Sequence, residues 1–160
     1  MNRKTVPNAE LFAEVRRLLG EGCRVTILAR GNSMMPFIRD GVDEVELASP
    51  ESGSSGSGGP VFAPGDILLC ELAPGNYVLH RLLKAEEGRL TLMGDGNLRG
   101  TESCPASSAV ARAVRIVRPD GRRVDCCSRV ELRKARIWRR LLPFRRILLA
   151  LWRRLHLPPL

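Results

Sequence analysis

Short apolar stretches separated by turn residues dominate the first 128 positions of the chain. These stretches are rich in β-branched and aliphatic residues and cover 24–30, 42–47, 66–72, 76–85, 89–93, 110–118 and 122–125. Short runs bounded by Gly, Pro and Asp are typical of strands joined by tight turns. The connections leave no room for the crossover helices of a parallel sheet. The pattern therefore predicts a mainly β fold, an antiparallel coiled β-barrel or sandwich.

Helical periodicity occurs only at the two ends of the chain. Residues 8–20 place their leucines and Val15 on one face, with acids early and arginines late, which is typical of a short amphipathic helix. Residues 131–142 and 144–155 predict two further helices, separated at Pro143. Proline disrupts a helix interior but is accepted in a first turn. We expect one N-terminal helix and a pair of basic C-terminal helices.

A low-complexity segment interrupts the β region at residues 50–60, where serine, glycine and proline predominate. Such a composition cannot bury enough apolar area to offset the entropy of ordering the chain. We expect a disordered surface loop within one domain, because neither flank is large enough to fold alone. The predicted organisation is a β domain over 1–128, including the first helix, followed by a helical tail over 129–160.

The net positive charge of the protein comes entirely from that tail. The formal net charge is +9, and residues 129–160 hold nine arginines and Lys134 against the single acid Glu131. The remaining 128 residues hold 16 basic and 16 acidic side chains. This asymmetry indicates a basic element attached to a neutral body, and it disfavours a body surface built to bind nucleic acid.

The second tail helix combines leucines on one face with flanking arginines and a tryptophan. This combination is typical of a helix that lies in the surface of an anionic membrane. Docking of the apolar face on the body or on a partner protein is the alternative, and nucleic-acid binding is a distant third. The residues expected to contact membrane or partner are Trp138, Phe144, Arg145, Arg146, Leu148, Trp152 and Arg153.

Cysteine and histidine usage argues against metal chemistry. The five cysteines have no metal-ligand spacing, and His80 and His156 are the only histidines, so we expect no metal and no cofactor. Reduced thiols fit a cytoplasmic protein. The chain has no run of 18 apolar residues and no apolar secretion signal at its start. We expect a cytoplasmic protein, with peripheral attachment to the inner membrane face through its tail.

One hydroxyl residue stands where the first predicted strand ends. In the stretch Gly31-Asn32-Ser33-Met34-Met35-Pro36, glycine permits a turn and proline ends the strand. A serine held there directs its hydroxyl and its backbone N–H out of the sheet end, as a nucleophile with an oxyanion hole requires. An ordinary turn is the alternative, since these residue types favour turns in any context.

A candidate general base lies on the predicted strand 76–85. Strict alternation places His80 on the same face as Val78 and Leu82. The alternative is a surface histidine, or a core histidine with its hydrogen bonds satisfied. Lys84 lies four residues further, about 13 Å along the strand, which is too far to replace His80 as the base.

Four short motifs follow one another in a specific order. They are Ser33-Met34-x-Pro36, Gly65-Asp66-Ile67, His80-Arg81-Leu82 and Gly94-Asp95-x-Asn97. In this order they resemble the superfamily of signal peptidase I and the LexA-like self-cleaving repressors. The His-Arg pair is similar to the ER, archaeal and spore-former branch, in which the base is histidine. The resemblance covers roughly residues 24–117 and implies a compact serine peptidase.

The resemblance implies that Ser33 attacks a peptide carbonyl while His80 removes its proton. The usual pair of aspartates after the Gly-Asp motif is absent, so either Glu102 or Asp95 is expected to orient His80, and for Asp95 a turn-stabilising role is equally open. The implied function is hydrolysis of a peptide bond in a peptide or protein precursor. The alternative is an inactive peptide-binding or membrane-associated adaptor module with the same fold.

The oxyanion hole is the least defined part of the expected site. Many signal peptidases carry a hydroxyl residue two positions before the serine, and this chain has Gly31 there. The backbone N–H of Ser33 is one expected donor, with Asn32 as a second. The resemblance implies that Met34, Met35 and Phe37 lie near bound peptide. Core packing is the alternative, above all for Phe37, and methionine suits either role.

Overall fold

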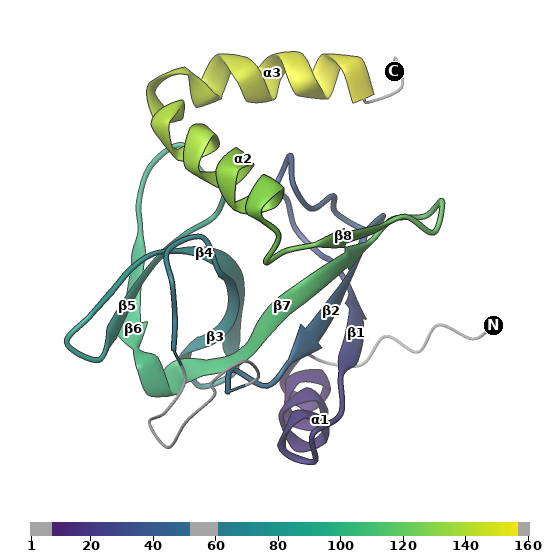
Figure 1. Cartoon of the computed structure of the whole chain (residues 1–160), viewed down its shortest axis with the longest axis vertical. Helices are drawn as coiled ribbons and strands as arrows, with labels where there is room; N and C mark the ends of the chain where they lie inside the picture. The colour runs from purple at the N-terminus through teal and green to yellow at the C-terminus, as the bar shows by residue number, and fades with distance from the viewer. Residues whose placement is uncertain (1–7, 52–60, 157–160) are drawn as a thin grey trace.

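An antiparallel eight-stranded sheet forms the body of the computed structural model, which describes residues 8–51 and 61–156 (Figure 1). Of the loop predicted at 50–60, positions 52–60 lie outside the described residues. The strands are β1 (Val25–Leu28), β2 (Glu44–Ala48), β3 (Ile67–Ala73), β4 (Asn76–Glu86), β5 (Arg89–Met93), β6 (Glu102–Pro105), β7 (Ala109–Val117) and β8 (Arg123–Asp125).

Neighbouring strands pair in the order β1-β2-β7-β3-β4-β5-β6, with β8 added beside β7. Every pairing is antiparallel, as predicted. The sheet is strongly curved, but the path ends at β1 and β6 without a ladder joining them, so it does not close into a barrel (Figure 1). Both end strands have only four residues, which offers little backbone for closure.

Three helices complete a mixed α/β fold over the described residues. They are α1 (Asn8–Gly20), α2 (Arg129–Arg140) and α3 (Arg145–His156), with 3₁₀ turns η1 (Ala106–Ser108) and η2 (Leu142–Phe144). The predicted break at Pro143 is confirmed, because this residue lies in η2 between α2 and α3. None of the helices in the described ranges has the length and apolar character needed to cross a bilayer.

The two faces of the sheet each bury an apolar cluster. On one face, Val15 and Leu19 of α1 pack with residues of β2, β3 and β7, among them Leu47 and Leu69. On the other face, Leu68 of β3 packs with leucines of β4 and β5. Adjacent residues of β3 therefore serve opposite cores, as the two-residue period of a strand requires. The helices α2 and α3 lie at the end of the sheet away from α1 (Figure 1).

Strand β6 is the one strand that the apolar pattern did not predict. Its sequence, Glu-Ser-Cys-Pro, has neither alternation nor an apolar run. It forms because β5 offers a free edge, on which Leu90 pairs with Cys104 and Leu92 pairs with Glu102. This tertiary pairing places Glu102 opposite Leu92 of β5, one strand away from β4.

Candidate active site

The loop that carries Ser33 leaves β1 and returns to β2, and hydrogen bonds close it at its base. The N–H of Ala29 donates to the Asp43 carbonyl at 2.9 Å, and the N–H of Gly41 donates to the Ala29 carbonyl at 2.8 Å. Within the loop, the N–H of Ile38 donates to the Met34 carbonyl at 3.0 Å. Ser33 therefore lies in an ordered turn, half-exposed at the end of the first strand.

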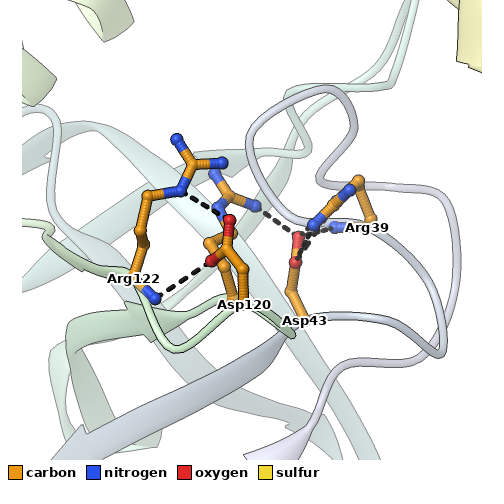
Figure 2. Close-up of polar contacts among 5 residues, drawn as sticks. Arg39, Asp43, Asp120 and Arg122 are labelled. Carbon is orange, nitrogen blue, oxygen red and sulfur yellow. Dashed lines mark hydrogen bonds and ion pairs between the residues drawn. The ribbon is translucent and has the colours of Figure 1, made fainter.

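A buried carboxylate holds the return of this serine loop (Figure 2). Asp43 is 0% exposed, and it accepts the backbone N–H of Arg39 at 2.8 Å and the Arg39 guanidinium at 2.7 Å. Arg118, at the end of β7, pairs with the same carboxylate. Burial raises the pKa of Asp43, but the hydrogen bonds from Arg39 and the charge of Arg118 outweigh that effect and leave the pKa below its ordinary value. The second half of the loop is thereby fixed to the sheet.

The turn at residues 94–97, directly after β5, receives the first half of the serine loop. The N–H of Gly96 donates to the Ser33 carbonyl at 2.7 Å. A methyl group added at Gly94 would lie well under 3.0 Å from that same carbonyl oxygen, and one added at Gly96 would meet the Asn32 carbonyl equally closely. Glycine is required at both positions because two backbone segments touch there.

Strand register places His80 of β4 next to the turn on which Ser33 packs. His80 lies directly opposite Leu68 of β3, and the pairing of β4 with β5 ends at Arg81 and Met93. The residues that follow this last pair are His80 and Gly94. A methyl group added at Gly94 would lie well under 3.0 Å from the Ser33 carbonyl oxygen. The Ser33 backbone therefore packs at the end of the β4 and β5 pair that also carries His80.

Glu102, and not Asp95, contacts the imidazole of His80. The Nδ1 atom of His80 lies 2.9 Å from Oε2 of Glu102, and the His80 residue is 5% exposed. A carboxylate oxygen accepts hydrogen bonds, so in the neutral imidazole this contact favours the tautomer with the proton on Nδ1 and leaves Nε2 as the acceptor. This is the tautomer that a general base needs.

Asp95 serves the opposite face of β4, which corrects the expectation that it could orient His80. Its carboxylate pairs with Arg81, with Nη2 at 2.6 Å and Nε at 2.9 Å, and both residues are buried. Arg81 also donates to the Gly65 carbonyl at 2.9 Å. Because adjacent strand residues face opposite ways, an acid that pairs with Arg81 is turned away from His80. A buried ion pair therefore joins the His80-Arg81 motif to the Gly94-Asp95 motif.

The methionines after Ser33 do not form a binding surface. Met34 is 3% exposed and Met35 is 7% exposed, and Met34 belongs to the larger apolar cluster. The expectation that they lie near bound peptide is wrong in this structure, because the turn directs them inward. Asn32 is exposed beside Ser33, so its side chain stays available as a donor.

The tail residues predicted to meet a membrane or partner divide into two groups. Arg145 is 3% exposed, and the Trp138 indole N–H donates to the Asp95 carbonyl at 2.8 Å, so both belong to the body and not to an outer surface. Leu148 and Trp152 are half-buried, whereas Phe144, Arg146 and Arg153 are exposed. The inward role of Trp138 and Arg145 has no signal in the sequence, because helical periodicity alone does not show what covers each face.

Besides Ser33 and His80, the described residues include acids and thiols that could in principle bind metal or act as nucleophiles. No three His, Cys, Asp or Glu side chains cluster to hold a metal within residues 8–51 and 61–156. All five cysteines are free thiols, and burial raises the pKa of Cys126 to about 12, which keeps that thiol protonated.

Comparison with known proteins finds no matching family model and no matching curated protein. The geometry of the site therefore carries the functional argument.

Proposed function

We propose that this chain is a serine endopeptidase of the signal-peptidase type, with Ser33 as nucleophile, His80 as general base and Glu102 as its orienting acid. The observation that carries the proposal is the hydrogen bond between Glu102 and His80, next to the end of the β4 and β5 pair where the Ser33 loop packs. The substrate is a peptide or a protein precursor. The curved antiparallel sheet is taken as a variant of the signal peptidase and LexA-like fold.

In the first half of the reaction, Nε2 of His80 removes the hydroxyl proton of Ser33 as its Oγ attacks the scissile carbonyl carbon. The tetrahedral intermediate carries its negative charge on the former carbonyl oxygen, and the Ser33 N–H and the Asn32 side chain are the donors proposed for it. His80 then donates the proton to the leaving amine as the C–N bond breaks. The product is an acyl-enzyme ester on Ser33.

In the second half, His80 removes a proton from water, and the resulting hydroxide attacks the ester. Collapse of this intermediate breaks the C–Oγ bond, and His80 returns the proton to Ser33. Glu102 stabilises the imidazolium in both halves through its bond to Nδ1. Burial of His80 beside this carboxylate holds the ring in one orientation.

A fluorophosphonate probe, which phosphonylates activated serines, tests the proposal. We expect the wild type to be labelled, and Ser33→Ala and His80→Ala to lose labelling. Ser107→Ala is the matched control, because Ser107 is an exposed serine on η1 with no role in the proposed mechanism, and this variant should be labelled like the wild type. No labelling of the wild type, or equal labelling of wild type and Ser33→Ala, would favour an inactive adaptor module instead.

We further propose that the outer face of α3 rests on an anionic membrane, at the inner face of a cell. Exposed apolar residues recur every three or four positions and form one stripe, which we call the α3 stripe. It consists of Phe144 at the end of η2 and Ile147, Leu151 and Leu155 of α3, all at least half exposed. Arg146, Arg153 and Arg154 are exposed beside it. An apolar stripe flanked by arginines matches the acyl and headgroup layers of an anionic bilayer.

A further inference from the structure

The basic tail grips the turn on which the serine loop packs. The Trp138 indole of α2 donates to the Asp95 carbonyl at 2.8 Å. The Arg145 guanidinium, at the start of α3, donates to the Asn97 carbonyl at 2.8 Å and lies 3.5 Å from the Gly94 carbonyl. Two tail side chains thus bind three of the four carbonyls of the 94–97 turn.

Trp138 and Arg145 also hold each other. The guanidinium carbon of Arg145 lies 5.3 Å from the centre of the Trp138 ring, within the range of a cation–π contact, and Arg145 lies 3.4 Å from the Trp138 carbonyl. The two side chains therefore act as one unit, which we call the tail clamp.

A second contact reaches the serine loop itself. The Phe37 ring lies 6.2 Å from the Trp138 ring at an angle of 74°, an edge-to-face arrangement. Phe37 also contacts Arg81, the partner of Asp95. The guanidinium carbon of Arg81 lies over the Phe37 ring, 4.9 Å from its centre. Trp138 therefore contacts both the turn that supports Ser33 and the segment four residues after it.

Burying a guanidinium costs free energy unless hydrogen bonds and a paired charge offset the loss of water. Arg145 is 3% exposed, and its Nε has no hydrogen-bond partner. Burial lowers the pKa of Arg145, with Asp95 acting in the opposite direction. An arginine used only for solubility would lie in water, as Arg146 does next to it. The position of Arg145 therefore points to a task at the 94–97 turn.

We propose that Trp138 and Arg145 are positioning residues, which hold the 94–97 turn so that Ser33 stays aligned with His80. This inference rests on the proposed peptidase function. The clamp fixes the carbonyls of the turn, and the N–H of Gly96 in that turn donates to the Ser33 carbonyl at 2.7 Å. The turn begins at Gly94, directly after Met93, which pairs with Arg81 beside His80. The basic tail then supports the active site through its contacts with the 94–97 turn.

The test measures the second-order rate of fluorophosphonate labelling across pH, together with the unfolding temperature. Trp138→Phe keeps a ring but loses the N–H donor, and Arg145→Lys keeps a charge but loses the fork of donors. We expect labelling to be about 10- to 100-fold slower in both, since small displacements of a reacting group are costly. The pH midpoint of labelling should stay that of the wild type, because the His80 and Glu102 pair is untouched.

Trp152→Phe is the matched control, because Trp152 is the other tryptophan of the tail. It stacks on His156 and borders the serine loop at Pro36 and Phe37, but it does not line the 94–97 turn. Its labelling rate should equal that of the wild type. Wild-type rates in both Trp138→Phe and Arg145→Lys would overturn the inference, as would an equal loss in Trp152→Phe. A graded loss of labelling rate supports the inference. In that case Arg145→Met is labelled more slowly than Arg145→Lys at a temperature at which both variants are folded. A wild type without labelling would overturn the peptidase proposal itself.

Discussion

At the scale of single residues, strand geometry decides which of two carboxylates contacts His80. Glu102 and Asp95 lie seven positions apart in the sequence, and both were open as the acid beside His80. Asp95 follows Gly94 and turns to the face of Arg81, where it is 4% exposed in an ion pair. Glu102 stands on β6 and reaches Nδ1 of His80 at 2.9 Å. Each acid therefore has a different partner and a different role.

Replacing Glu102 with glutamine should slow fluorophosphonate labelling by about 10²- to 10⁴-fold, because the amide no longer stabilises the imidazolium or its productive tautomer. The unfolding temperature should change little, since the Glu102 side chain is 30% exposed. Labelling kinetics and a thermal melt measure both effects. Glu86→Gln is the control at an exposed acid on β4, and it should behave as wild type. A wild-type rate for Glu102→Gln would remove this residue from the mechanism.

At the scale of elements, the serine loop is held from two sides. Its first half packs on Gly94 and Gly96, and its return is fixed by Asp43 against Arg39 and Arg118 (Figure 2). Asp43 is fully buried, so its charge is compensated only by these two guanidinium groups and the Arg39 N–H. Loss of the carboxylate would leave both arginines without their partner at the base of the loop.

Asp43→Asn should lower the free energy of unfolding by about 3 kcal/mol at neutral pH, the usual cost of breaking a buried ion pair. The folded-state pKa of Asp43 lies below its ordinary value of 3.8, so this stability is present above pH 3.8 and is lost as pH falls through the folded-state pKa. Denaturant melts of both proteins between pH 7 and pH 2 measure the difference.

The difference between wild type and Asp43→Asn should be constant down to about pH 4 and shrink below it. Asp120→Asn is the matched control, because Asp120 pairs with Arg122 on the exposed surface beside this network (Figure 2). That substitution should have a much smaller effect. A difference that stays constant down to pH 2 would contradict the assigned direction of the pKa shift.

At the scale of the whole molecule, a neutral sheet domain carries a tail with two different faces. One face docks through Trp138, Arg145 and Leu149, the last of which is 4% exposed. The other face leaves the α3 stripe open, with Leu155 80% exposed. The sequence left membrane contact and docking on the body or a partner as alternatives for this helix. In the structure, Leu149 of α3 is buried and the stripe on its other side is exposed.

Flotation with vesicles of phosphatidylglycerol and phosphatidylcholine tests the open face. The wild type should float with the anionic vesicles, less at high salt, and remain unbound with phosphatidylcholine alone. Leu151→Glu should weaken binding about 10-fold, because a leucine leaves the apolar layer. Ala150→Glu adds the same charge at an adjacent exposed position outside the stripe and should bind better than Leu151→Glu. Equal flotation of both variants would contradict membrane contact through this stripe.

Local sequence alone determined most of the elements of this protein. The helix Asn8–Gly20, the strands from β1 to β5, the β7 and β8 hairpin and the break at Pro143 were all predicted, because apolar periodicity and turn residues act over a few positions. The sequence also identified Ser33 and His80 as candidate catalytic residues, from a predicted strand end and a predicted apolar strand face. These signals survive folding because they depend on neighbours in the chain.

Tertiary structure decided which of these residues meet. Strand β6 has no periodic signal and exists only because β5 has an open edge, and that pairing alone brings Glu102 to His80. Met34 and Met35 turned inward, and Trp138 and Arg145 became supports of the 94–97 turn, because burial depends on what packs against a face. Periodicity specifies that a face is apolar or charged, but only the packed chain specifies what lies opposite it.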